Sequence, residues 1–111
     1  MISVTRLALM AAALPLPALA DLQLQTSRYL CDRGVELPAA YVSDASSGIV
    51  TLTVEGRQIS LYQQEAASGV RYGWPSDGSN YVWLTKGTLA TLLWRDGATK
   101  TEITLLSCEA Q

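Results

Sequence analysis

The sequence of 111 residues predicts an all-β fold, an antiparallel sandwich or barrel built from short strands. Two observations lead to this prediction. Beyond residue 20, β-branched, aromatic and other apolar residues alternate with polar ones in short runs, which is typical of strands with one buried face. Each run ends at Gly, Asp, Asn or Pro, and these turn residues recur at regular spacing without a long loop.

The clearest element is a hairpin. Residues 49–54 alternate Val and Leu with Thr, so the aliphatic side chains share one face of a strand. Glu55-Gly56 predicts a tight turn, and residues 57–62 predict the partner strand with Ile59 and Leu61 turned inward.

Six further runs are predicted as strands, which brings the total to eight. One of them, residues 89–94, remains ambiguous because Leu89, Leu92 and Leu93 also have the i, i+3, i+4 spacing of a helix face. The six runs are residues 27–31, 36–42, 70–74, 81–86, 89–94 and 100–108.

Most aromatic residues lie inside these runs, and aromatic residues within strands usually pack in a core or a barrel wall. Trp74 is different, because it precedes Pro75 and a polar loop, and we expect it to be exposed and available to a partner. The residues expected to pack are Trp83, Trp94, Tyr29, Tyr41 and Tyr62.

Residues 1–20 predict a secretory signal peptide. They carry Arg6, then an apolar stretch over residues 7–14, and end in Ala18-Leu19-Ala20. The apolar stretch is far shorter than the ~20 residues of a spanning helix, so we expect no stable membrane insertion. No Cys directly follows it, which argues against a lipoprotein. We expect cleavage to leave one exported, soluble domain of residues 21–111.

The two cysteines, Cys31 and Cys108, lie near opposite ends of that domain. An exported protein meets an oxidising compartment, which favours a disulfide that joins the first strand to the last. A loop of about 77 residues corresponds to about 4 to 4.5 kcal/mol of unfolded-state entropy. A metal or redox pair would need closely spaced Cys or further ligands, and the chain has no His.

Composition excludes several function classes. The net charge is −2, and becomes −3 without Arg6, so no basic surface is available for nucleic acid. A catalytic Ser would lack its usual base, His. The carboxylates of Glu55, Asp77 and Asp96 fall in predicted turns, and neither a phosphate-binding loop nor a metal-ligand cluster is present. We infer a protein that acts by binding, with no catalytic residue, metal or cofactor.

Two segments then point to a known family. They are Ser68-Gly69-Val70-Arg71-Tyr72 and Tyr81-Val82-Trp83-Leu84-Thr85-Lys86-Gly87, and Tyr29-x-Cys31 and Cys108 flank them. Together they resemble the MliC/PliC family, the membrane-bound and periplasmic inhibitors of c-type lysozyme of Gram-negative bacteria. The chain departs from that pattern at Thr88-Leu89-Ala90, where members often carry acidic residues.

The resemblance implies an eight-stranded antiparallel β-barrel in the periplasm whose partner is a c-type lysozyme. It also implies that Ser68 and Lys86 enter the lysozyme cleft and meet its two catalytic carboxylates. Taken alone, these two residues also fit a turn cap and a solvated charge at a strand end. The positions that would shape the two loops are Gly69, Tyr72, Tyr81 and Gly87.

Two other functions stay open at this stage. One is a small barrel that binds a glycan or an apolar molecule, with Trp74 and Tyr81 as stacking residues. Barrels of this strand number built from short strands are usually filled by their own side chains, which argues against it. The other is a structural module of the periplasm. The sequence leaves the oligomeric state and the natural lysozyme target open.

Overall fold

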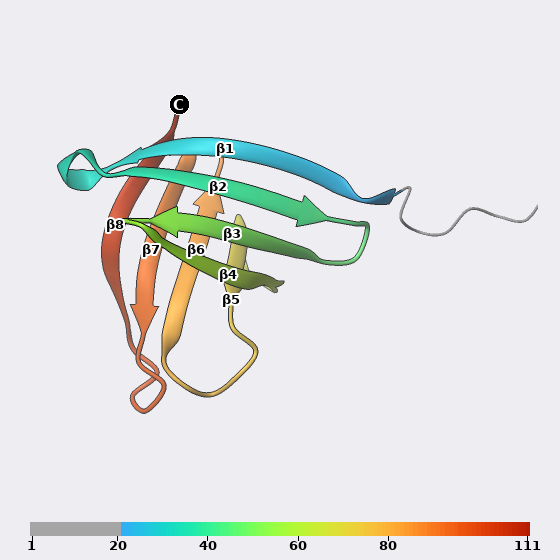
Figure 1. Ribbon diagram of the computed structural model, residues 1–111. Coiled ribbons are helices and arrows are strands. Elements are labelled where there is room, and N and C mark those ends of the chain that lie inside the picture. The colour runs from blue at the N-terminus through green and yellow to red at the C-terminus, as the bar shows by residue number, and fades with distance from the viewer. Residues whose placement is uncertain (1–20) are drawn as a thin grey trace, which may run out of the picture.

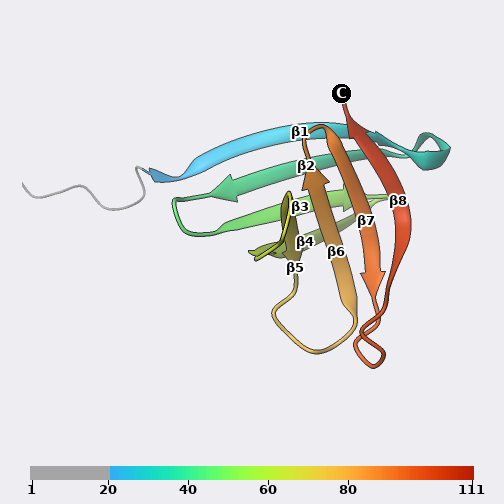
Figure 2. The same cartoon turned by 180° about the vertical axis from the view of Figure 1, so that it is seen from behind.

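The computed structural model describes residues 21–111 and shows a closed antiparallel barrel of eight strands (Figures 1 and 2). The predicted signal peptide, residues 1–20, lies outside the described residues. Within residues 21–111, no helix is long and apolar enough to cross a membrane. The strands are β1 (Gln23–Cys31), β2 (Glu36–Ser43), β3 (Gly48–Val54), β4 (Arg57–Gln64), β5 (Val70–Gly73), β6 (Asn80–Lys86), β7 (Leu89–Arg95) and β8 (Glu102–Ala110).

All eight predicted strands are confirmed, and the ambiguous segment at residues 89–94 is strand β7. The last strand begins at Glu102, two residues later than predicted. The preceding loop explains the difference. The Asp96 carboxylate accepts the backbone N–H groups of Ala98 and Thr99, at 2.8 and 3.2 Å, and Lys100 has a φ of 63°, so the chain cannot extend there.

Each strand pairs with its neighbours in sequence, and β1 pairs with β8 to close the barrel. This closure is short, since only Tyr29, Leu30 and Cys31 pair with β8. The pairing of β1 with β2 is much longer and runs from Gln23 to Leu30. The first half of β1 therefore projects beyond β8, and Figure 1 shows β1 and β2 extending past the body of the barrel.

The core fills the barrel interior. Ile59 and Leu61 point inward as predicted, and Trp83 is fully buried. The prediction of Tyr62 as a packed residue is wrong, because its exposed fraction is 45%. The reason is the alternation of β4: with Leu61 inside, the next side chain must lie on the outer face.

The predicted disulfide between Cys31 and Cys108 is confirmed, and both residues are buried. The two cysteines are direct partners in the β1–β8 ladder. The bridge therefore lies at the short seam that closes the barrel, as the prediction of a link between first and last strands requires.

Replacing both Cys31 and Cys108 with Ser should lower the free energy of unfolding by about 2 to 5 kcal/mol. The disulfide spans 77 residues, so its loss greatly enlarges the unfolded ensemble. Thermal melting and urea unfolding would measure the change, with the wild-type protein treated with a reducing agent as a second route to the same state. Unchanged stability of the double variant would contradict the assigned role of the bridge.

Candidate functional site at one mouth of the barrel

The two predicted loops meet at one end of the barrel. Ser68 and Gly69 lie in the β4–β5 loop, directly before β5, and Val70 pairs with Thr85 of β6. A Cβ atom built on Gly69 would lie 2.3 Å from the Thr85 carbonyl oxygen and 3.3 Å from Lys86 Cβ. The β4–β5 loop therefore packs directly against the backbone that carries Lys86.

Gly87 and Gly69 are required for different reasons. Gly87 has a φ of 61° and is the first residue of the two-residue turn between Lys86 and Leu89, where type II′ turns need a positive φ. Nothing lies within 4 Å of a Cβ atom built there. Gly69 has a φ of 68° and also lacks space for a side chain. Gly87 thus sets a turn, whereas Gly69 permits a close approach.

The side chains of Ser68 and Lys86 are exposed and available to a partner. Within residues 21–111, Lys86 forms no salt bridge, and Ser68 makes no side-chain hydrogen bond. Ser68 is therefore not the turn cap that its residue type allowed. The mouth presents a cation and a hydroxyl whose hydrogen-bonding groups are free of internal partners.

A pocket of about 440 Å³ opens beside these loops. Its wall contains Tyr72, the predicted loop-shaping residue, which is buried and forms part of the interior rather than of a loop. Gly87 also lines it. The remaining lining residues are Gln25, Ser27, Tyr29, Tyr41, Ser43, Thr85, Thr88 and Ala110.

A network of aromatic side chains supports the pocket from inside. Trp83 Nε1–H donates to the Tyr41 hydroxyl oxygen at 3.0 Å, and the Tyr41 and Tyr29 hydroxyl oxygens lie 2.7 Å apart. The Tyr29 and Trp83 rings pack edge to face at 5.2 Å, and the Tyr41 and Tyr72 rings are 5.7 Å apart. The network fixes the pocket wall, because each ring is held by at least one neighbour.

Burial raises the pKa of two phenols in this network. Desolvation raises the pKa of Tyr41 far above its usual value, and the hydrogen bond to Tyr29 adds to the effect. Burial likewise raises the pKa of Tyr72. Burial thus moves the Tyr41 and Tyr72 phenols further from ionisation, and their hydroxyl groups can donate and accept hydrogen bonds.

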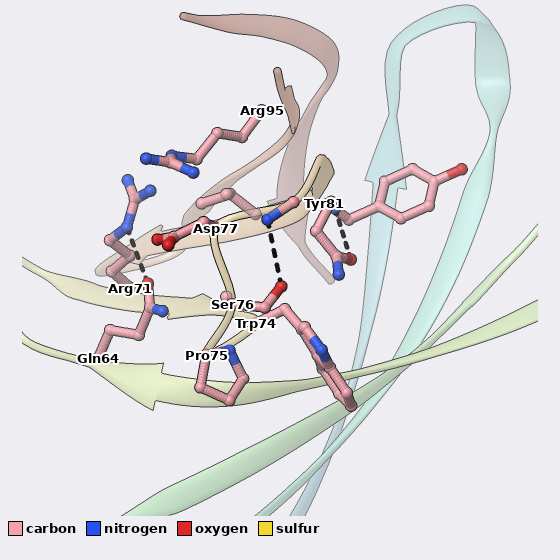
Figure 3. A pocket seen from close by; sticks show the side chains of 12 residues that line it. Gln64, Arg71, Trp74, Pro75, Ser76, Asp77, Tyr81 and Arg95 are labelled. Atoms are coloured by element: carbon pink, nitrogen blue, oxygen red, sulfur yellow. Dashed lines mark hydrogen bonds between the residues drawn. The ribbon is translucent and has the colours of Figure 1, made fainter. Parts of the chain in front are cut away.

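Tyr81 is not brought to this mouth. It lies near the start of β6, whereas Lys86 ends that strand, and its ring packs on Trp94 at a centroid distance of 5.0 Å. Tyr81 and Trp74 instead line a second pocket of about 390 Å³ at the other end of the barrel (Figure 3). Trp74 is exposed, as predicted, and its ring lies 5.4 Å from that of Tyr62.

Arginines dominate one side of this second pocket. Arg71 donates to Gln64 at 3.1 Å and to the Glu102 carboxylate, and Arg95 lies 3.7 Å from the same carboxylate. Hydrogen bonding to Arg71 lowers the pKa of Glu102. The cluster links β5 to β8 outside the core, and in Figure 3 the Tyr81 ring points away from it. Trp74 and Tyr81 thus do not form the pair of stacking rings that a glycan-binding barrel would use.

Several residues of the first pocket were not predicted from the sequence. The predicted start of the first strand, residue 27, left Gln25 out, although Gln25, Ser27 and Tyr29 alternate onto one face. Tyr29 and Tyr41 were expected to pack, and they do, but their hydroxyl ends also reach the pocket. Period-two alternation extended two residues upstream would have found Gln25.

Comparisons with known proteins agree with the fold. The family described as "Membrane-bound lysozyme-inhibitor of c-type lysozyme" (MliC) matches residues 29–101. Among solved structures, the chain is similar to MliC of Pseudomonas aeruginosa, crystallised in complex with hen egg white lysozyme, with a TM-score of 0.64 and 20% sequence identity. That match covers 96% of this chain and 100% of the other. A search of curated proteins finds no match.

The close approach of Gly69 to Thr85 predicts that a side chain at position 69 destabilises the fold. Gly69→Ala should lower the free energy of unfolding by about 2 kcal/mol or more, because a left-handed residue is strained and the new methyl group overlaps a backbone oxygen. Gly87→Ala is the matched control with a similar positive φ but open space around the new methyl group, and should cost less, about 1 kcal/mol. Urea unfolding measures both. Equal costs would show that the loop does not pack on Thr85.

Proposed function

The chain belongs to the MliC family of c-type lysozyme inhibitors, and from that membership we propose that it inhibits a c-type lysozyme by placing Ser68 and Lys86 in the active-site cleft of the enzyme. One observation carries the proposal. The loop with Ser68 packs against Lys86, with 3.3 Å between Lys86 Cβ and a Cβ atom built on Gly69. The two side chains can therefore enter one cleft together.

The chemistry of the two side chains suits that cleft. A lysozyme cleft holds a catalytic glutamic acid and an aspartate. An ammonium group can pair with these carboxylates, and a hydroxyl can both donate and accept. Neither Ser68 nor Lys86 has an internal partner to give up within residues 21–111. On binding they would give up only water, and the contacts with the carboxylates would offset that loss.

The pocket beside the loops supports the same orientation. It lies at the same mouth and shares Thr85 and Gly87 with the Lys86 turn. Its neutral hydroxyl groups can receive a polar protrusion of the enzyme while the Ser68 and Lys86 loops occupy the cleft. Because Tyr81 lies near the other end of β6, we propose no direct contact between its side chain and lysozyme.

We also propose that the protein acts in the periplasm after removal of residues 1–20, and not as a lipoprotein. Two features support this. The first 20 residues have the layout of a signal peptide without a following Cys, and the disulfide at the β1–β8 seam needs an oxidising compartment. Inhibition there would protect the cell wall from lysozyme that passes the outer membrane.

Lys86→Ala should weaken lysozyme binding by about 2 to 5 kcal/mol, because the enzyme carboxylates lose a buried partner. The control is the other lysine of the sequence, Lys100, which lies in the β7–β8 loop at the opposite end of the barrel. Lys100→Ala should change affinity by less than ~1 kcal/mol. Isothermal titration against hen egg white lysozyme measures both, and equal affinity of wild type and Lys86→Ala would exclude the proposed insertion.

Affinity should also depend on pH. The catalytic glutamic acid of free lysozyme has a pKa near ~6, and a bound ammonium group would lower it. The Lys86 contribution should therefore be complete above the free pKa and decrease as the pH falls toward the lowered value. Titrations at neutral and mildly acidic pH should show a smaller pH dependence for Lys86→Ala. Ser68→Ala should cost about 0.5 to 1.5 kcal/mol if its hydroxyl makes a neutral hydrogen bond, and up to ~3 kcal/mol if it meets an ionised carboxylate.

A further inference from the structure

A row of exposed apolar side chains crosses the outer wall of the barrel. Leu24 pairs with Val42, Val42 with Ile49, Ile49 with Tyr62, and Tyr62 contacts the ring of Trp74. Their exposed fractions range from 37% for Val42 to 73% for Leu24. The strands that carry the first four lie side by side in Figure 2. We call this row the apolar ridge.

A shallow hollow runs beside the ridge on the same face. The next row of outward-facing residues lies two positions from the ridge on each strand. In this row Thr26 pairs with Ala40, and Ala40 pairs with Thr51, so the side chains are small where those of the ridge are large. These residues and Pro38 line a pocket of about 370 Å³. The outer wall of β1, β2 and β3 is thus a ridge of large apolar groups next to a hollow of small ones.

The ridge and the adjoining hollow row contain no charged side chain. Arg28 stands at the far border of the hollow and pairs with Glu36 at 3.4 Å. A two-fold interface brings a surface patch against itself, and a patch of one charge sign would repel its copy. The ridge is uncharged, and Arg28, the charged residue that lines the hollow, is paired with Glu36, so the two surfaces can interdigitate without like-charge repulsion.

We propose that this face binds a second copy of the chain, with the apolar ridge of each copy seated in the hollow of the other. Closed strand pairing leaves β2 and β3 no free edge, so association over these two strands uses side chains packed face to face, whereas the part of β1 that projects beyond β8 keeps a free edge beside Leu24. The two-fold arrangement places each ridge against the small side chains of Thr26, Ala40 and Thr51 in the hollow of the other copy.

The area agrees with a weak dimer. The exposed fractions of the five ridge residues correspond to about 500 Å² of surface, at the upper end of what monomeric proteins expose in one patch. Two copies would bury about 1,000 Å², near the lower limit for a specific interface. The dimer should therefore form reversibly and depend on protein concentration.

This interface is separate from the proposed lysozyme site. Adjacent residues of β2 point in opposite directions: Tyr41 lines the inner pocket at the mouth, and Val42 belongs to the ridge. The proposal thus goes beyond the proposed inhibition, and a dimer would carry two mouths.

Sedimentation velocity of the secreted protein over micromolar to millimolar concentrations tests the proposal. The wild type should shift reversibly from monomer to dimer. Ile49→Lys should weaken dimerisation by at least about tenfold, because each interface would then bury two unpaired ammonium groups. The matched control is Ile103→Lys in β8, an apolar residue that is 59% exposed and lies away from the ridge. It should dimerise like the wild type.

Three results would overturn the proposal. One is a wild-type protein that stays monomeric throughout the range. Another is a folded Ile49→Lys variant, judged by its melting temperature, that dimerises normally. The third is evidence that something else occupies the face. Loss of lysozyme inhibition by Ile49→Lys would assign the ridge to lysozyme. Binding of the wild type to vesicles of phosphatidylethanolamine and phosphatidylglycerol that Ile49→Lys loses would assign the ridge to a lipid surface. Intact inhibition by this variant, together with weaker dimerisation, supports the second copy.

Discussion

Closure of the barrel at the seam between β1 and β8 is the constraint on which the rest of the structure depends. Only three residue pairs of this ladder join the two ends of the sheet, and the Cys31–Cys108 bridge is one of them. An open sheet of this size would expose its apolar inner face and two strand edges. The covalent link at this short pairing keeps β8 beside β1, and thereby holds Tyr29 and Ala110, both of which line the mouth pocket, in place.

Inside the closed barrel, the mouth is built on aromatic residues that carry one polar atom each. Tyr41 joins Tyr29 and Trp83 through its hydroxyl group, so a polar network lies where the apolar core meets the pocket. At such a position the ring packs against apolar neighbours while the hydroxyl group keeps a hydrogen-bond partner. Within residues 21–111, no buried side-chain nitrogen or oxygen lacks a hydrogen-bond partner. The mouth is therefore rigid below, whereas Ser68 and Lys86 above it remain exposed.

Much of the fold was predictable from local pattern, because alternation and turn residues act over a few residues. Glu55 and Gly56 do form a tight turn, with φ values of 50° and 80°, and the flanking strands have the predicted inward residues. The start of β1 was missed because residues 23–26 are exposed on both faces, so no buried face marks them as a strand, and only the alternation of Ser27 and Tyr29 continued upstream reaches Gln25. The meeting of Ser68 with Lys86 depends on the β5–β6 register, which no local signal encodes; it was expected only from the family resemblance. Tyr81 was expected from the same resemblance to shape these loops, but its position in the strand already places it far from them. Five residues of strand, about 16 Å, separate it from Lys86.

The register of β2 connects the two surfaces of the protein. Because side chains alternate, a shift of one residue would turn Tyr41 outward and Val42 inward, and would remove both the pocket wall and the apolar ridge. The β2–β3 turn opposes such a shift. The Asp44 carboxylate accepts the backbone N–H groups of Ser46 and Ser47 at 2.8 and 2.9 Å, which lowers its pKa, and Ser43 pairs with Gly48 next to it. A short exposed turn thus sets which face of β2 serves the proposed lysozyme site and which serves the proposed dimer.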